Sequence, residues 1–563
     1  MTRPPLTADF ESGFPSPRIV DSRRLMGPNL MHAGVGAVVD VLLDDSQTDG
    51  NGTLLAAWHA RVSQIAAALG WPDADTVQRQ YPGGASLFVN APVDQLMTAT
   101  DVCESAWVHA EATAAERDAG DAASIAALRV LAEAEARPTL MAVWNAAQMR
   151  GLNVTFDEST VAIGTGIGAQ CWPIDELPAV DAIDWSVVRD IPIVLVTGSN
   201  GKTTVVRMVA AMARAEGHVV GHTCTDGVWI GDAQVESGDW SGPVGARRVL
   251  QDPSVTLAVL ETARGGILRR GLAIQRASVA AIVTLSPDHF GEYGIIDLAT
   301  LADAKLVVGR AVSESGVLVY NATIPALVDS MASYRGRVAP VACDTATLAR
   351  AGFNQMPAAL GGTATHNLLN ATIAAAIARE LRLGPAADAA LLRFGAGDDD
   401  NVGRLMVRKI GTVTVVVDYA HNAQGVAALI EATRHIPATR RAIALGTGGD
   451  RDDVALHAIA KAAFDSGVID FYIAKEMPKF LRGRAAGSIS GVLLHALRAL
   501  GVHDAQLTSA PDDLSAAELA LEWAQDGDLI LLATHDQREA VLALLAARAQ
   551  ASSASVAVSN PHT

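Results

Sequence analysis

Short apolar runs alternate with helical stretches from residue 191 onward. IPIVLV (191–196), VTLAVLE (255–261), VAAIVTL (279–285) and GVLVY (316–320) are brief and rich in β-branched residues, as buried strands are. Helical segments separate them, and another helix is predicted to begin near His366. This alternation predicts an α/β fold with a parallel sheet covered by helices.

The same alternation returns closer to the end of the chain. TVTVVVDYAHN, RAIALGTGG, FYIAKE and DLILLAT supply four more strand candidates, enough for a smaller α/β domain. Between the two regions lies GAGDDDNVGR (395–404), whose glycines and successive aspartates predict a linker with a hinge near Asp398 to Asp400. The final ASSASVAVSNPHT is typical of a disordered tail.

The first 150 residues lack this alternation. Alanine-rich, helix-like segments, notably from Ala110 to Ala136, follow a strand-like run, ASLFVNAP, and 563 residues are too many for one core. We therefore predict the following parts: a separate α+β N-terminal domain (1–150), a connecting segment (151–190), a central domain (191–397), a C-terminal domain (398–550) and a disordered tail (551–563).

Composition narrows the class of protein. Acidic residues outnumber basic ones 61 to 43, and the resulting net charge of −18 disfavours a nucleic-acid partner.

No apolar run approaches the roughly 18 to 20 residues that cross a bilayer, and MTRPPLTADFESGFPSP does not resemble a signal peptide. The four cysteines, which form no CxxC pair, suit a reducing compartment, so we expect a cytoplasmic protein. Homo-oligomerisation stays open.

The stretch TGSNGKTT, between an apolar strand and a helix, has the properties of a phosphate-binding loop. Its glycines allow close backbone approach, and the helix beginning near Lys202 directs its amide groups at an anion. Lys202 would meet the outer phosphates and Thr203 would place its hydroxyl on magnesium. Val196 stands where the usual Walker spacing has its first glycine. The predicted nucleotide-binding residues of the loop are Gly198, Ser199, Asn200, Gly201, Lys202, Thr203 and Thr204.

The short form TGxNGKT resembles the loop of the Mur ligase family, and further motifs follow in the family's order. ETARGG (261–266) resembles the segment whose glutamate helps hold magnesium, and DHFGEYG (288–294) resembles the segment whose histidine holds a second magnesium. The resemblance therefore implies Thr203, Glu261 and His289 as metal ligands. Lys305, in LADAKLVV, matches a lysine that is carbamylated in several members, which implies a catalytic role beside Lys202, Glu261 and His289.

Other segments resemble the family's nucleotide-binding motifs. HNLLN (366–370) is similar to the adenine-contacting segment, which implies Asn367 and Asn370 as contacts. NVGR (401–404) is similar to the segment that supplies a phosphate-contacting arginine, here Arg404. DYAHN (418–422) resembles the motif whose aspartate holds the ribose, which implies Asp418 with His421 beside the nucleotide. The nucleotide would then lie between the central and C-terminal domains.

Within this family, several segments are most similar to the Mur-like ligase half of the cyanophycin synthetases: GHTCTDGVWIGD, SGPVGARRVLQDP, ETARGGILRRGL, GGDRDD and LRGRAAG. RRLMGPNLM resembles part of the N-terminal domain of those enzymes. Their ATP-grasp domain has no counterpart, because residues 151–190 lead directly into the Mur-like region. The similarity implies an amine-substrate pocket, with a charged solvated loop as the alternative interpretation, formed by Asp450, Arg451, Lys475, Arg482 and Arg484.

The residues themselves argue for phosphoryl transfer, since they combine a phosphate loop, a lysine and oxygen ligands for magnesium. The family resemblance implies an ATP-dependent ligase that forms a peptide or isopeptide bond. ATP and magnesium would be its cofactors, and an amino acid or related amine would be joined to a carboxylate-bearing small peptide or amino-acid acceptor.

Two alternatives remain from the sequence. One is a cell-wall precursor ligase. The other is a catalytically impaired ATP-binding regulatory or assembly subunit, which the absent ATP-grasp domain favours. Thr284 also favours it, because the family usually has asparagine at this position, four residues before the Asp-His pair.

Overall fold

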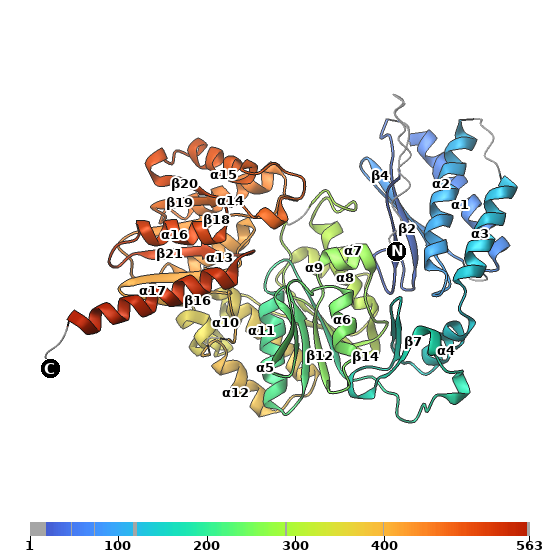
Figure 1. Cartoon of the computed structure of the whole chain (residues 1–563), viewed down its shortest axis with the longest axis horizontal. Helices are drawn as coiled ribbons and strands as arrows, with labels where there is room; N and C mark the ends of the chain where they lie inside the picture. Colours follow the sequence, from blue (N-terminus) through green and yellow to red (C-terminus); the bar gives the residue numbers. More distant parts are fainter. Residues whose placement is uncertain are drawn as a thin grey trace.

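The computed structural model describes residues 19–46, 48–71, 74–115, 121–287, 290–397 and 399–559. Its central domain lies between the N-terminal and C-terminal domains (Figure 1). Among the described residues, no helix is both long and apolar enough to cross a membrane.

The N-terminal domain is a four-stranded antiparallel sheet with helices on one face (Figure 1). Its strands, in the order β1-β2-β4-β3, are β1 (Ile19–Leu25), β2 (Gly36–Leu42), β3 (Thr76–Tyr81) and β4 (Gly84–Asn90). Its helices are α1 (Thr48–Leu69), α2 (Leu96–Ala114) and α3 (Asp121–Glu135). Trp58 and Trp107 are fully buried between them. The alanine-rich stretch predicted as helical is thus shared by two helices, and residues 116–120 lie outside the described part.

Residues 138–190, which include the segment expected only to connect two domains, form a folded unit whose core also includes Val93 and Leu96 of the N-terminal domain. Helix α4 (Pro138–Met149) packs beside an antiparallel sheet of β5 (Val154–Phe156), β6 (Thr160–Ile163) and β7 (Gln170–Pro173). Asn153 ties this unit to the central domain, because its Oδ1 accepts from the amide of Gln275 at 3.0 Å and its Nδ2 donates to the carbonyl of Arg276 at 2.9 Å.

The central domain contains an eight-stranded sheet in the order β11-β10-β9-β12-β8-β13-β14-β15. The strands from β9 to β15 in this order run parallel, as predicted, and β10 and β11 add an antiparallel edge. The strands are β8 (Ile193–Thr197), β9 (Val220–Cys224), β10 (Gly227–Ile230), β11 (Ala233–Ser237), β12 (Leu257–Glu261), β13 (Ala277–Ile282), β14 (Val312–Asn321) and β15 (Val338–Val341).

Helices cover both faces of this sheet. One core contains residues of α5 (Lys202–Ala215), α11 (Thr365–Glu380) and α12 (Pro385–Arg393). The other contains residues of α6 (Pro243–Leu250), α7 (Arg264–Arg270), α8 (Leu298–Arg310) and α9 (Pro325–Met331). The short α10 (Thr345–Arg350) precedes α11. The prediction of an α/β fold built on a mainly parallel sheet is therefore confirmed.

The C-terminal domain has a six-stranded sheet in the order β16-β17-β21-β18-β19-β20, parallel except for β16. Its strands are β16 (Met406–Ile410), β17 (Val413–Asp418), β18 (Arg441–Leu445), β19 (Phe471–Lys475), β20 (Leu507–Ala510) and β21 (Leu529–Ala533). Its helices are α13 (Ala423–Thr433), α14 (Asp453–Asp465), α15 (Ser488–Ala499), α16 (Asp513–Trp523) and α17 (Arg538–Ser559).

Helix α17 extends into the region expected as a disordered tail. Residues 551–559 form its last turns, and only residues 560–563 lie outside the described part. The alanine-rich composition accounts for this difference, because alanine has the highest intrinsic helix propensity.

The N-terminal domain holds a loop of the central domain that follows the predicted Asp-His pair. The Arg79 guanidinium donates to the carbonyls of Tyr293 at 2.8 Å and Gly294 at 2.7 Å. Arg23 places its guanidinium carbon 4.5 Å from the centre of the Tyr293 ring. A Cβ atom on Gly294 would overlap the Tyr81 ring. The loop and the N-terminal sheet are therefore in direct contact.

Gly294→Ala is expected to destabilise the protein, because residue 294 has a φ of +66° in addition to the overlap with Tyr81. Gly291→Ala is the matched control, since Gly291 has a φ of +95° but open space at the Cβ position. The backbone conformation alone costs about 1 to 3 kcal/mol. Thermal unfolding should show a larger loss for Gly294→Ala, and equal losses would contradict the contact.

Candidate active site

A cavity of about 910 Å³ lies between the central and C-terminal domains. Its volume is within the usual range for small-molecule sites. It is lined by the loop before α5, the end of β12, the first turns of α11, and residues that follow β17, β18 and β21. The predicted phosphate loop and the DYAHN segment thus share one cavity.

The phosphate loop is held in one conformation by its neighbours. Gly201 caps α5 with a φ of +84°, and a Cβ atom there would overlap Oδ1 of Asn370. The amide of Ser199 donates to the carbonyl of Thr284 at 3.0 Å, and its Oγ donates to the carbonyl of Ser286 at 3.1 Å. Only glycine fits this close approach, and the free amides at the start of α5 remain available to an anion.

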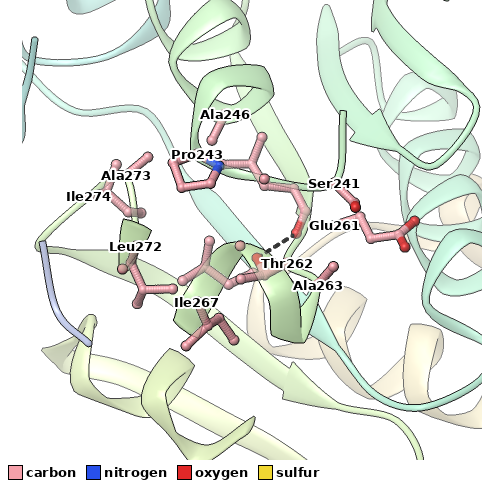
Figure 2. Close-up of a pocket in the computed structure, with 15 residues that line it drawn as sticks. Ser241, Pro243, Ala246, Glu261, Thr262, Ala263, Ile267, Leu272, Ala273 and Ile274 are labelled. Carbon is pink, nitrogen blue, oxygen red and sulfur yellow. Dashed lines mark hydrogen bonds between the residues drawn. The ribbon is translucent and has the colours of Figure 1, made fainter. Parts of the chain in front are cut away.

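Thr203 and Glu261 provide oxygen atoms beside this loop. The Thr203 hydroxyl donates to Glu261 Oε2 at 2.7 Å, and Lys202 Nζ is 3.9 Å from Oε1. Oε1 has no hydrogen-bond partner among the described residues, and burial raises the pKa of Glu261 more than Lys202 and Thr203 lower it. Figure 2 shows the Glu261 carboxylate directed away from Ile267, Leu272 and Ile274, which line a small apolar pocket behind it. A buried carboxylate oxygen and a hydroxyl are suitable ligands for magnesium, so these residues fit the predicted ion.

The other predicted catalytic residues are less completely described. Lys305 is buried on α8 and lines the same cavity. His289 and its neighbour Asp288 lie outside the described residues. The predicted part of His289 in a second metal site therefore stays a prediction.

Thr284, which departs from the family pattern, contacts the phosphate loop directly. Its Oγ1 accepts from the amide of Asn200 at 2.8 Å and donates to the carbonyl of the same residue, also at 2.8 Å. One hydroxyl thus satisfies both backbone groups of Asn200. Thr284 therefore supports the phosphate loop, although the replacement of the usual asparagine by threonine did not indicate this in the sequence.

The predicted nucleotide-binding residues lie on both walls of the cavity. Asn367 and Asn370 are buried at the start of α11, and Asn370 Nδ2 donates to Asn367 Oδ1 at 3.2 Å. On the opposite wall, Asp418 accepts from the amide of Leu405 at 2.7 Å. Burial raises the pKa of Asp418 more than Arg404 and the backbone amides lower it.

Arg404 and His421 also line the cavity. The Arg404 guanidinium carbon lies 4.1 Å from the centre of the Tyr419 ring, which is the geometry of a cation–π contact. The His421 ring lies edge-on to the same tyrosine, 5.4 Å away between ring centres. The Arg404 and His421 side chains thus both pack against the Tyr419 ring, near the start of the C-terminal domain.

Asn200 joins the phosphate loop to the C-terminal domain. Its Oδ1 accepts from Asn422 Nδ2 at 3.1 Å, and its Nδ2 donates to Gln424 Oε1 at 2.9 Å. These contacts bring the DYAHN segment to the phosphate loop across the domain boundary.

The five residues predicted for an amine pocket separate into two groups. Asp450, Arg451 and Arg482 line the cavity, whereas Lys475 and Arg484 do not. Arg484 instead supports the GGDRDD loop, because it donates to the carbonyls of Arg451 at 2.6 Å and Gly449 at 3.2 Å.

Lys475 belongs to a buried cluster behind the cavity wall. It is 1% exposed, lies 2.5 Å from Asp513 Oδ1 and donates to His535 Nδ1 at 3.0 Å. Since Nδ1 accepts this bond, the ring proton is on Nε2, which lies 3.2 Å from the carbonyl of Ala420. The cluster therefore fixes His535 in the cavity wall.

The charged or titratable lining residues that sequence reasoning missed include Arg264, Arg269, Glu292 and His535. Arg264 forms an ion pair with Glu292, and Arg269 Nε donates to the Tyr293 hydroxyl at 3.3 Å. The two arginines lie in ETARGGILRR, directly after Glu261, and their position after a functional strand end was the available signal. His535 follows DLILLAT in the same way.

Comparisons with known proteins match the two domains that form this cavity. The model of the Mur ligase middle domain matches residues 196–378, and that of the Mur ligase, glutamate ligase domain matches residues 403–535. The cyanophycin synthetase of Trichormus variabilis is 33% identical over 380 residues, which cover 61% of this chain and 41% of that enzyme. The chain therefore matches less than half the length of that relative.

More distant similarities are found as well. The UDP-N-acetylmuramoyl-L-alanyl-D-glutamate--2,6-diaminopimelate ligase of Corynebacterium glutamicum is 26% identical over 61% of this chain and 70% of its own. The structure of Mycobacterium tuberculosis folylpolyglutamate synthase complexed with ADP is 18% identical, covers 63% of this chain and 90% of its own, and gives a TM-score of 0.47. The predicted resemblance to the Mur ligases is confirmed by the two domain matches.

Thr284→Val should weaken ATP binding, because it keeps the side-chain volume and removes both hydrogen bonds to Asn200. Two net hydrogen bonds correspond to about 1 to 3 kcal/mol, or roughly 5- to 150-fold in affinity. Thr284→Ser keeps the hydroxyl and is the control. Calorimetric titration with ATP checks this, and equal affinity of the valine variant would count against the contact.

Asp513→Asn should destabilise the protein in a pH-dependent way. Burial favours the neutral acid, but Lys475, His535 and the backbone amides outweigh it and lower the pKa of Asp513 from 3.8 to about 2. The stabilisation is therefore present above pH 3.8 and is lost as the pH falls toward 2. Breaking a buried pair costs about 3 to 5 kcal/mol. Thermal unfolding should show a difference from wild type that is large at pH 7 and shrinks in acid, whereas a constant difference would contradict the assignment.

Proposed function

Because the chain belongs to the Mur ligase family over its central and C-terminal domains, we propose that it is an ATP-dependent carboxylate-amine ligase. It would convert a substrate carboxylate to an acyl phosphate and join it to an amino acid or related amine, releasing ADP and phosphate. The observation that carries this proposal is that the phosphate loop, the Thr203–Glu261 pair and Asp418 line a single cavity between two domains.

The chemistry follows from the reluctance of a carboxylate to lose oxide. Transfer of the terminal phosphoryl group of ATP gives the carboxylate a good leaving group, and an amine can then attack the carbonyl carbon. The amine loses a proton, the C–N bond forms and the C–O bond to phosphate breaks. Transfer of this kind depends mainly on positioning and charge stabilisation.

The residues of the chain supply those two effects. The amides at the start of α5 and the Lys202 ammonium would bind the outer phosphates. Thr203 and Glu261 would hold magnesium, which, when bound, offsets the charge on the transferring phosphoryl group. Asn370 and Asp418 would orient the adenosine from opposite walls.

The two-domain arrangement would protect the acyl phosphate from water. Asn200 contacts Asn422 and Gln424 across the boundary, so the phosphate end of the cavity closes when the domains meet. We place the hinge in the linker at Asp398 to Asp400. Asp400 Oδ2 there accepts from the amides of Gly395 at 2.9 Å and Gly397 at 3.0 Å, and Asp398 lies outside the described residues.

The carboxylate acceptor and the amine would occupy the part of the cavity beyond the phosphates. Arg264, Arg269 and Glu292 line it from the central domain, and Asp450, Arg451 and Arg482 line it from the C-terminal domain. The N-terminal domain would contribute by holding the loop that carries Glu292. A reaction that consumes ATP suits the cytoplasm, as do cysteines that are all free thiols.

Lys202→Ala should lower ATP-dependent product formation by on the order of 100-fold or more, because it removes the cation from the phosphate site. Phosphate release is measured for amino acids paired with short acidic peptides, including aspartate-rich ones, and with a nucleotide-linked muropeptide. Mass analysis then identifies any product. Lys461→Ala is the control, since Lys461 lies on the exposed face of α14.

The outcomes separate the possible functions. Release of ADP that requires both an amine and a carboxylate supports the ligase, and a muropeptide product would identify a cell-wall precursor ligase. Tight ATP binding without turnover across the whole screen would instead favour a binding subunit. Undiminished ligation by Lys202→Ala would refute the role of the phosphate loop.

A further inference from the structure

Asp226, in the turn between β9 and β10, is surrounded by arginines from three parts of the chain. It is 4% exposed. Arg207 of α5 donates from Nη2 to Oδ2 at 2.6 Å, and Arg538 at the start of α17 donates to Oδ1. Arg404, in the linker between the domains, lies 3.8 Å from Oδ2. One carboxylate therefore joins the central domain, the linker and the C-terminal domain.

A chain of polar contacts leads from this carboxylate to the proposed metal ligands. Arg404 Nη2 donates to Thr225 Oγ1 at 3.0 Å, and the Thr225 and Thr203 hydroxyl oxygens are 3.1 Å apart. The Thr203 hydroxyl in turn donates to Glu261 Oε2 at 2.7 Å. The Arg404 guanidinium is thus separated from the phosphate loop by a single threonine.

Packing around Arg404 limits where its guanidinium can go. It lies over the Tyr419 ring, donates a hydrogen bond to Thr225 at its edge and forms a longer ion pair with Asp226 at 3.8 Å. The preceding Gly403 has a φ of +67°, and a Cβ atom there would overlap Cδ of Arg538. The stem of Arg538 therefore covers the linker at the residue before Arg404, while its guanidinium binds Asp226.

The charges in this cluster allow two explanations for the role of Asp226: it neutralises the nearby arginines, or it orients one of them. Burial disfavours its ionised form, but Arg404, Arg207 and Arg538 outweigh burial and lower the pKa of Asp226 to about 2, so the carboxylate stays ionised at neutral pH. If it only neutralised three nearby cations, its loss would strengthen the binding of an anion. If it orients Arg404, its loss would weaken that binding.

We propose that Asp226 is a positioning residue that directs the Arg404 guanidinium toward the phosphates of the nucleotide and, through Arg538, couples this orientation to the seating of the C-terminal domain. The contacts of Arg404 favour this explanation, because a cation that is stacked on one face and bonded at its edge has little freedom. The inference rests on the proposed function, since it requires that the cavity bind a nucleoside triphosphate.

The test is a calorimetric titration of the full chain with the magnesium complex of AMPPNP, a non-hydrolysable ATP analogue. Asp226→Asn keeps the size of the side chain and removes its charge. Asp226 and Arg404 form an ion pair at 3.8 Å, and an ion pair of this kind contributes up to about 1 kcal/mol, so the dissociation constant should rise roughly 5-fold. Arg404→Met should weaken binding as well, and the double variant should be no weaker than Arg404→Met alone.

A matched control separates positioning from general loss of stability. Asp528 is another buried carboxylate paired with an arginine, Arg440, but it lies at the start of β21, the end of that strand opposite His535. Asp528→Asn should lower the unfolding temperature and leave AMPPNP binding unchanged. If Asp226→Asn does not fold, Arg538→Met removes only the partner from α17. Arg538→Met should also weaken AMPPNP binding, and this loss of affinity should vanish when Arg404→Met is already present.

The results distinguish the two levels of the argument. Wild type that binds no AMPPNP would overturn the proposed function and this inference with it. Wild type that binds, together with unchanged or tighter binding by Asp226→Asn, would overturn the inference alone. Additive losses in the Asp226→Asn, Arg404→Met double variant would also overturn it, because Asp226 would then act by another route.

Discussion

The site depends on the parallel register of β8 and β12, which pairs Glu261 with Val196. Because the two strands end together, the carboxylate that terminates β12 lies beside the loop that leaves β8. Burial makes this carboxylate costly to ionise, and Lys202, Thr203 and a divalent ion are the groups that can compensate it. A shift of register would bury Glu261 away from Lys202 and Thr203. The pairing of β8 with β12 therefore sets the position that the proposed phosphate chemistry needs for this carboxylate.

The sequence predicts the apolar parallel strands but misses the parallel strands β9, β15 and β20 and the antiparallel edge strands, for a physical reason. Strand β9, VGHTC, is buried but contains no run of apolar residues. Strands such as β8 and β12 are covered on both faces and consist of apolar runs. In contrast, TVQRQY in β3 and AQVES in β11 have one or both faces exposed, so they contain no apolar run. The strands within residues 151–190 were not predicted, because they have only three or four residues each.

The motif residues of the site could be predicted because each motif ends a strand or begins a helix at the same edge of a sheet. Lys475 shows where this reasoning stops. It also ends a strand, β19, but its ammonium turns to Asp513, which is 38 residues later in the sequence. The sequence shows that Lys475 is charged, but it does not show that Asp513 pairs with this lysine and that the pair is buried. Thr284 is the converse case, because its departure from the family pattern suggested a defect, yet its hydroxyl supports the phosphate loop.

The net charge of −18 disfavours the binding of a polyanionic nucleotide overall. The electrostatic potential inside the cavity, however, depends mainly on the charges closest to it. At physiological ionic strength, interactions between exposed charges decay over about 8 Å, so most surface carboxylates contribute little inside the cavity. The phosphate end contains Lys202, Arg404 and the start of α5, and Arg207 and Arg538, the other two arginines around Asp226, add positive charge next to them. A carboxylate in the middle of that cluster then does not cancel the attraction. It orients the cations instead, so a buried aspartate beside the proposed phosphate site is compatible with the binding of an anion.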